Sequence, residues 1–165
     1  MSSKFNALAG MAAVALAGAM LAAPVQAQYR QTISDDPAKC AAGVGPAVRV
    51  TVRGIRESHG TIRVQSYRAT KQDWLEKGRW INRMEAPARA GTMSFCVPLP
   101  AAGSYGIAVR HDFNGNGKTD IFTDGGAMSN NPGINIFNLG KPDYRKVAFA
   151  VGSGVEAISV TMRYR

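Results

Sequence analysis

The run HDFNGNGKTD at residues 111–120 carries the clearest chemical signal in the sequence. Ca²⁺ takes about six to eight oxygen ligands, and a short loop can supply them from side chains at positions one, three, five and nine, with a glycine at six and a backbone carbonyl at seven. The run has an oxygen donor at each ligand position and a glycine at the turn. The predicted ligands are Asp112, Asn114, Asn116, the carbonyl of Lys118, and Asp120, with Gly117 at the turn.

The loop departs from a full EF-hand pattern at position twelve, where Thr123 stands in place of a bidentate glutamate. Asp124 follows one residue late, and spacing assigns it no role. With two carboxylates and two neutral amides, a Ca²⁺ site here should be weak, with a dissociation constant of about 10⁻⁴ to 10⁻³ M, as in extracellular modules. The alternative is a tight turn built by Asn and Gly residues without a metal. Both interpretations remain open.

His111 and Asp112 are adjacent and could suggest a general base for a hydrolase. Neighbouring residues of a strand point to opposite faces, so the pair is poorly placed for joint catalysis. The sequence also has no G-x-S-x-G nucleophile elbow and no paired-histidine metal spacing. We therefore expect a protein that is not an enzyme, and we keep a hydrolase acting through this pair as a third hypothesis.

Short runs with a period of two should position this loop. Val48, Val50 and Val52 alternate with polar residues, and so do Ile62 and Val64, which is typical of strands that bury one face. The glycine-containing turn between the two runs predicts a hairpin. The outer face of this hairpin would carry three basic residues: Arg49, Arg53 and Arg63.

Further alternating runs predict more strands. They lie at 93–97 and 105–109, with a turn of Pro and Gly between them, and at 147–151 and 158–164 in the C-terminal third. Residues 71–80, which include Trp74, Leu75 and Trp80, are the one stretch expected to form a short helix. About seven short strands separated by turns predict an all-β fold, an antiparallel β-sandwich.

The N-terminal residues 1–27 have the order of a signal peptide: one charge at Lys4, an apolar run, and small residues before a cleavage site at Ala27. The run consists mostly of Ala and Gly, whereas a membrane anchor needs about 20 strongly apolar residues. We therefore expect cleavage, no transmembrane segment in the mature protein, and a periplasmic or secreted location. Residues 28–46 should form a flexible N-terminal arm, and residues 47–165 the β-sandwich domain.

The sequence has two cysteines, Cys40 and Cys96. In an exported protein such a pair favours a disulfide over a metal site or a nucleophile. The bridge would close a loop of about 55 residues and stabilise the fold by about 3 to 4 kcal/mol. Because Cys40 lies in the expected arm, two free thiols are the alternative.

The formal net charge is +9. An excess of this size favours contact with anionic surfaces through long-range attraction, although it can also serve solubility alone. A module that binds lipopolysaccharide or acidic polysaccharide through Arg49, Arg53 and Arg63, without a metal, is therefore the alternative to a calcium-binding module. We do not expect nucleic acid as a partner.

The run from Tyr105 to Asp120, together with Gly125, Gly126 and the Ser-Asn-Asn run at 129–131, resembles a bacterial family catalogued as domain of unknown function 2141. The resemblance covers most of the chain, from about residue 48 to residue 164. It implies an exported β-sandwich similar to transthyretin-like or carboxypeptidase regulatory-like modules, and no established activity. Family members tend to have an acidic residue after the loop that this chain lacks.

Together these observations favour a non-catalytic exported β-sandwich. In this hypothesis the loop at 112–120 binds Ca²⁺, orders the chain as far as Asn131, and presents a surface to an unknown macromolecule or glycan.

Overall fold

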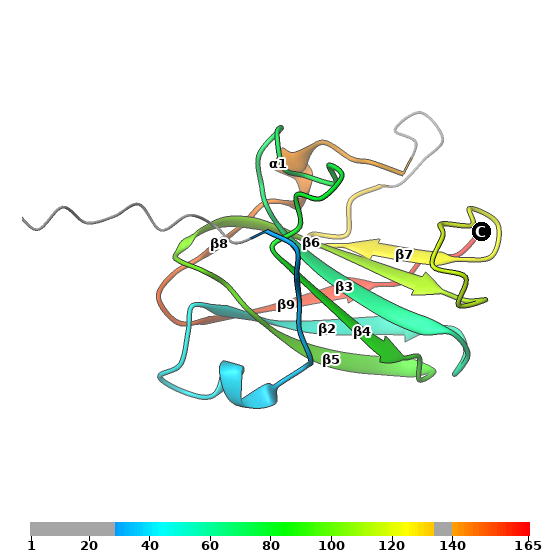
Figure 1. The fold of residues 1–165 in the computed structure, drawn as a ribbon, viewed down its shortest axis with the longest axis horizontal. Coiled ribbons are helices and arrows are strands. Elements are labelled where there is room, and N and C mark those ends of the chain that lie inside the picture. The colour runs from blue at the N-terminus through cyan, green and yellow to red at the C-terminus, as the bar shows by residue number, and fades with distance from the viewer. Residues whose placement is uncertain (1–28, 134–139) are drawn as a thin grey trace, which may run out of the picture.

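Two β-sheets pack face to face in the computed structural model, which describes residues 29–133 and 140–165 (Figure 1). The predicted signal peptide lies outside the described residues. The larger sheet has the order β1 (Gln31–Thr32), β4 (Asn82–Pro87), β3 (Thr61–Arg68), β6 (Gly103–Asp112) and β7 (Gly125–Met128), and β8 (Phe149–Val151) also pairs with β6. The smaller sheet has the order β5 (Gly91–Pro98), β2 (Ala47–Ile55) and β9 (Val155–Thr161).

The core lies between the two sheets and comes from the predicted alternation. Val48, Val50 and Val52 of β2 are fully buried, and their partners across the core include Ile62 and Val64 of β3. The polar residues between them point outward on each sheet, as a period of two requires. The all-β sandwich predicted from the sequence is thus confirmed, with nine strands in the described part of the chain.

Strand pairing differs from the prediction in two ways. The sandwich is not wholly antiparallel, because β2 runs parallel to β9 and β1 runs parallel to β4. The predicted hairpin is wrong: β2 pairs with β5 and β9, β3 pairs with β4 and β6, and residues 56–60 cross from one sheet to the other. Alternation reports which face of a strand is buried, and it does not report the partner strand.

The helix predicted at 71–80 is absent from the described residues, which form a series of turns there. One turn is closed by a hydrogen bond from the Trp74 amide to the Thr70 carbonyl (3.0 Å). It ends at Leu75, which has a φ of 55° and therefore a left-handed backbone conformation. Asp73 accepts hydrogen bonds from Thr70, Tyr29 and Arg79 and holds this turn in place. Trp74 is buried over the outer face of the larger sheet, beside Val147 of the short helix α1 (Tyr144–Val147).

Residues 29–46 lie along the sandwich, in contrast to the flexible arm expected from their composition. β1 pairs with β4, and the 3-10 helix η1 (Pro37–Cys40) ends at Cys40, whose buried disulfide with Cys96 confirms the predicted bridge. The Asp35 carboxylate also accepts a hydrogen bond from the Cys96 amide (2.8 Å). In the described residues, no helix has the length and apolar character needed to cross a membrane.

Candidate functional site

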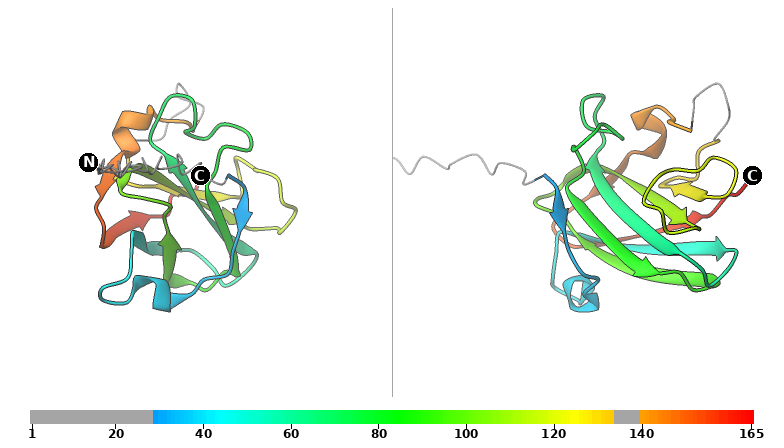
Figure 2. Two further views of the ribbon diagram at one scale, coloured as in Figure 1. Left: turned by 60° about the vertical axis from the view of Figure 1, so that its left-hand side comes forward. Right: turned by 45° about the vertical axis from the view of Figure 1, so that its right-hand side comes forward.

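The predicted ligand loop connects β6 to β7 at one end of the larger sheet, beside the C-terminus (Figure 2). β6 carries Asp112 to the start of the loop, where its side chain is only 5% exposed. Its Oδ2 atom accepts a hydrogen bond from the Gly117 amide (2.9 Å), so the carboxylate lies against the turn. Its Oδ1 atom is buried and has no hydrogen-bond partner. An unpartnered buried carboxylate oxygen is rare and costly in folded proteins, and this one stands at the first predicted ligand position.

Two Asx turns shape the middle of the loop. Asn114 Oδ1 accepts from the Asn116 amide (3.1 Å), and Asn116 Oδ1 accepts from the Lys118 amide (2.7 Å). The side-chain nitrogens of both asparagines donate to Oδ2 of Asp120, at 2.8 and 2.7 Å. These hydrogen bonds lower the pKa of the Asp120 carboxyl, so it is ionised at neutral pH. The structure therefore brings two of the predicted ligand side chains, Asn114 and Asn116, together with Asp120.

Asp124 braces the loop, a role that spacing did not assign. Its Oδ1 accepts from the Phe113 amide (3.1 Å), and its Oδ2 accepts from the Asp120 amide (3.0 Å), so one buried carboxylate joins the two ends of the loop. Both oxygens are used in this way. Asp124 thus acts on the backbone, and Thr123 at position twelve offers no bidentate carboxylate.

Arg110 is the functional residue that sequence reasoning missed. Its guanidinium donates to Asp112 Oδ2 (3.1 Å), the Gly117 carbonyl (3.0 Å) and Thr119 Oγ1 (2.9 Å). Arg110 stands two residues before Asp112 on the same strand, so the two side chains share a face of the sheet. This spacing in the sequence could have predicted that Arg110 lies beside Asp112. A positive charge is thus already close to the first predicted ligand.

No three His, Cys, Asp or Glu side chains gather as a metal cluster anywhere in the described ranges 29–133 and 140–165. A cation in this loop would depend on amide and carbonyl oxygens as much as on carboxylates. This ligand chemistry suits Ca²⁺, which binds carbonyl and amide oxygens readily.

His111 faces the opposite side of β6 from Asp112, as its neighbouring position requires. It is fully buried, with Nε2 at 2.6 Å from the His59 carbonyl and Nδ1 at 2.8 Å from the Tyr164 hydroxyl. A carbonyl can only accept, so Nε2 donates. The Tyr164 oxygen accepts from the Arg56 amide (3.1 Å) and donates to Nδ1. Both ring nitrogens therefore serve the fold, and the structure does not bring His111 and Asp112 together as a catalytic pair.

The Ser-Asn-Asn run after β7 also has a structural role. Ser129 Oγ donates to the Val147 carbonyl (2.6 Å) and accepts from the Ile107 amide (3.0 Å). Asn131 donates to the Ser159 carbonyl (3.1 Å) and accepts from the Thr161 amide (2.7 Å), which ties this segment to β9 of the other sheet.

A family model described as "Uncharacterized protein conserved in bacteria (DUF2141)" matches residues 50–159, which is more than half of the chain. The chain belongs to this family. The match confirms the resemblance read from the loop and the segments around it. No curated protein and no solved structure matches the chain. The description of the family gives no activity, so the DUF2141 domain must be interpreted from its own residues.

The hydrogen bonds of His111 lead to a stability prediction for the DUF2141 domain. In Tyr164→Phe, Nδ1 of the buried histidine loses its only donor, and we expect the free energy of unfolding to fall by about 1 to 3 kcal/mol. Urea unfolding followed by fluorescence measures the change. The matched control is Tyr144→Phe, because the Tyr144 hydroxyl forms no hydrogen bond with any described residue, and it should change stability by less than about 0.5 kcal/mol. Equal effects of the two changes would contradict the role of Tyr164.

The three arginines predicted to share a basic face lie on two different faces. Arg49 and Arg53 project from β2 in the smaller sheet, where they donate to the Cys40 carbonyl (2.7 Å) and to Ser159 Oγ (2.9 Å). Arg63 projects from β3 in the larger sheet and forms an ion pair with Glu85 (2.6 Å). They are separated because the predicted hairpin does not form.

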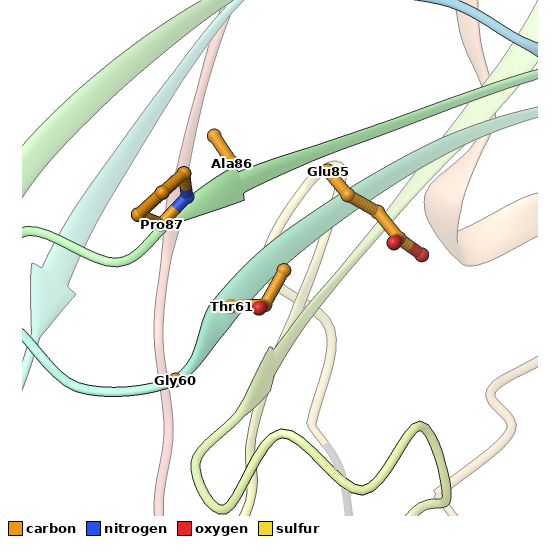
Figure 3. A pocket seen from close by; sticks show the side chains of 5 residues that line it. All are labelled: Gly60, Thr61, Glu85, Ala86 and Pro87. Carbon is orange, nitrogen blue, oxygen red and sulfur yellow. The ribbon is translucent and has the colours of Figure 1, made fainter.

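Two open hollows lie near the loop end of the sandwich. One, of about 260 Å³, is lined by Gly60, Thr61, Glu85, Ala86 and Pro87, with Glu85 its one ionisable residue (Figure 3). The other, of about 410 Å³, lies within the ligand loop itself and is lined by Asn114, Thr119, Asp120, Ile121, Phe122 and Thr123. Ile121 and Phe122 are 61% and 81% exposed, so the loop presents apolar side chains beside its polar ones.

Proposed function

We propose that the DUF2141 domain is a non-catalytic exported module whose loop at 112–120 binds Ca²⁺ and presents a surface to a macromolecule or glycan. The observation that carries the proposal is the buried Oδ1 atom of Asp112, which has no partner and occupies the first position of a ligand-spaced loop. Export is supported by the signal-peptide order of residues 1–27 and by the disulfide, which is typical of oxidising compartments.

The ligands would be Asp112, Asn114, Asn116, the carbonyl of Lys118, and Asp120. The two asparagines now direct their side-chain nitrogens to Asp120, and rotation of each amide would direct its oxygen inward instead. Arg110 opposes Ca²⁺ binding, because its guanidinium forms an ion pair with the Asp112 carboxylate and repels a second positive charge there. The low carboxylate count and this competing charge both favour weak affinity.

The exposed Ile121 and Phe122 support an interaction role. They lie between Asp120, a predicted ligand, and Asp124, which braces the loop. A cation held by the loop would restrict the backbone that carries both side chains. Binding of Ca²⁺ would in this way prepare an apolar contact for a partner, at a lower cost in conformational entropy.

Calorimetric titration with Ca²⁺ tests the site. We expect saturable binding with a dissociation constant of about 10⁻⁴ to 10⁻³ M. The double variant Asp112→Asn and Asp120→Asn keeps the side-chain shapes and removes both charges, so it should bind at least about tenfold more weakly. No binding by the unmodified protein up to about 10 mM, above the range of weak extracellular sites, would reject the proposal.

Arg110→Gln provides the opposite control in the same experiment. Removal of the guanidinium from Asp112 should strengthen Ca²⁺ binding by up to about tenfold, the effect expected of a unit charge a few ångströms from the site. The matched variant is Arg53→Gln on the other sheet, which makes the same change in net charge away from the loop. If both variants strengthened binding equally, net charge alone would explain the result.

A second candidate function is binding to anionic lipid or polysaccharide without a metal. The exposed Arg49 and Arg53 on one face of β2 favour it, together with the net charge of +9. Such binding should weaken strongly from low salt to several hundred millimolar salt, because exposed charges are screened. Binding that is unchanged over this range would exclude it.

A further inference from the structure

Three arginines come together on the outer face of the larger sheet, and one of them, Arg110, also pairs with the predicted Ca²⁺ ligand Asp112. Arg83, Arg63 and Arg110 belong to the neighbouring strands β4, β3 and β6. Arg63 is directly opposite Arg110, and Arg83 is opposite Gln65, two residues along the same face from Arg63. Adjacent strands are about 4.8 Å apart, so the long side chains of all three residues can reach one another.

The arginines differ in how their charges are compensated. Arg63 pairs with Glu85, and Arg110 pairs with Asp112. Among the described residues, no carboxylate lies within ion-pair distance of Arg83, whose guanidinium stacks on Trp80 at 4.0 Å from the ring centroid. Burial lowers the pKa of Arg83, and the neighbouring charge of Arg63 lowers it further, while attraction to Glu85 offsets part of this change. An arginine nevertheless stays protonated at neutral pH.

This face also has N–H groups without partners. The Nε atoms of Arg83 and Arg110 and the Nε1 atom of Trp80 are all buried, and none forms a hydrogen bond. Buried donors without acceptors are rare and costly in folded proteins. A guanidinium without an ion pair, beside several unused donors, is the arrangement that an anion with more than one acceptor oxygen would satisfy.

We propose that the outer face around Arg83, Arg63, Arg110 and Trp80 binds a phosphate group. A tetrahedral oxyanion suits this face better than a carboxylate, because three donors on three residues are unused and a carboxylate offers only two oxygens in one plane. The planar guanidinium fork can pair with phosphate through two hydrogen bonds, and Arg83 forms no ion pair with any described residue that would compete. The phosphate would be free in solution or carried as an ester on a larger molecule.

The two tryptophans provide an internal probe for the site. The Trp80 Nε1 atom has no partner, whereas the Trp74 Nε1 atom, in the neighbouring buried cluster, donates to the Pro142 carbonyl (3.0 Å). In a titration with inorganic phosphate at constant ionic strength, followed by the indole N–H signals in ¹⁵N NMR spectra, the Trp80 signal should shift saturably. The Trp74 signal should not. A response to acetate as large as the response to phosphate would overturn the proposal.

A second arm replaces inorganic phosphate with glycerol 3-phosphate. Binding of both compounds supports the site and shows that it accepts a phosphate ester. Binding of inorganic phosphate alone supports the site for the free ion. No saturable shift of the Trp80 signal with either compound would overturn the proposal.

Arg83→Gln should weaken phosphate binding at least about tenfold, because a charge-assisted hydrogen bond and the uncompensated charge are both lost. Arg83→Lys keeps the charge and loses the fork, so its affinity should fall between those of Arg83→Gln and the unmodified protein. Arg53→Gln on the opposite sheet is the matched control and should retain binding. Unchanged binding in Arg83→Gln, or equal loss in both glutamine variants, would overturn the proposal.

A replacement variant and a Ca²⁺ titration separate loss of the phosphate site from misfolding and from loss of the Ca²⁺ site. If Arg83→Gln fails to fold, judged by its NMR spectrum, Arg63→Gln replaces it, with the same weakening expected. The Ca²⁺ titration of the Arg83 variants should match that of the unmodified protein, because Arg83 contacts none of the predicted Ca²⁺ ligands. Failure of the phosphate site and failure of the Ca²⁺ site are therefore distinguishable.

Discussion

Gly60→Ala should reduce the free energy of unfolding by about 3 kcal/mol or more. Gly60 has a φ of +73°, a conformation that costs a residue with a Cβ atom about 1 to 2 kcal/mol. A Cβ atom here would also lie 2.1 Å from the Asp112 carbonyl oxygen and 2.5 Å from that of Phe113, and relief of such a clash adds about 1 to 3 kcal/mol. The clash would separate the start of β3 from the end of β6, where Thr61 pairs with Asp112.

Gly43→Ala is the matched control, because Gly43 has a similar φ of +77° and no atom within 4 Å of the added methyl group. It should lose only the backbone contribution, about 1 to 2 kcal/mol. Urea unfolding of both variants isolates the clash as the difference between them. The Ca²⁺ titration should also show weaker binding in Gly60→Ala than in Gly43→Ala, because Asp112 is displaced. Equal stabilities would show that the β3 and β6 ends can move apart freely.

Gly60 illustrates which part of the fold the sequence could predict. The turn that contains it was recognised from its residues, and the strands on either side were placed correctly by their alternating valines and isoleucines. The role of the glycine differs from the predicted one, because Gly60 allows close contact with Asp112 at the end of β6, 52 residues later in the chain, and does not close a hairpin. Local periodicity does not report which distant segments of the chain pair with each other.

The candidate site shows the same division between local and non-local information. Spacing alone placed Asp112, Asn114 and Asn116 in one loop, and the two Asx turns follow from local chemistry. The brace formed by Asp124 depends on how the loop closes, and spacing could not supply it. The arginine face was predicted wrongly, because the prediction placed Arg63 in the same sheet as Arg49 and Arg53. Arg63 lies in the other sheet, opposite Arg110, and local spacing does not report this strand order.

Removal of the disulfide in Cys40→Ala and Cys96→Ala should reduce the free energy of unfolding by about 4 kcal/mol, the chain-entropy value for a bridge of this span. The two cysteines are 56 residues apart in sequence, and the bridge attaches the segment before β2 to β5. The segment has other contacts near the bridge, from Asp35 to the Cys96 amide and from Arg49 to the Cys40 carbonyl. These contacts hold the native geometry without the bridge, so the loss should appear as lower stability of the same fold.

Reduction of the unmodified protein distinguishes the bridge from the packing of its side chains. The reduced protein keeps both buried sulfur atoms, so its urea unfolding reports the loss of the crosslink alone, and it should account for most of the effect of the double variant. A loss of less than about 1 kcal/mol on reduction would mean that the unfolded chain is already restricted by residual structure. A reduced protein that also lost the β1 to β4 pairing, seen as rapid amide exchange at Gln31 and Ile33, would instead show that residues 29–46 are held mainly by the bridge. We expect these amides to stay protected, because they donate to the carbonyls of Ile81 and Arg83 at 2.9 Å.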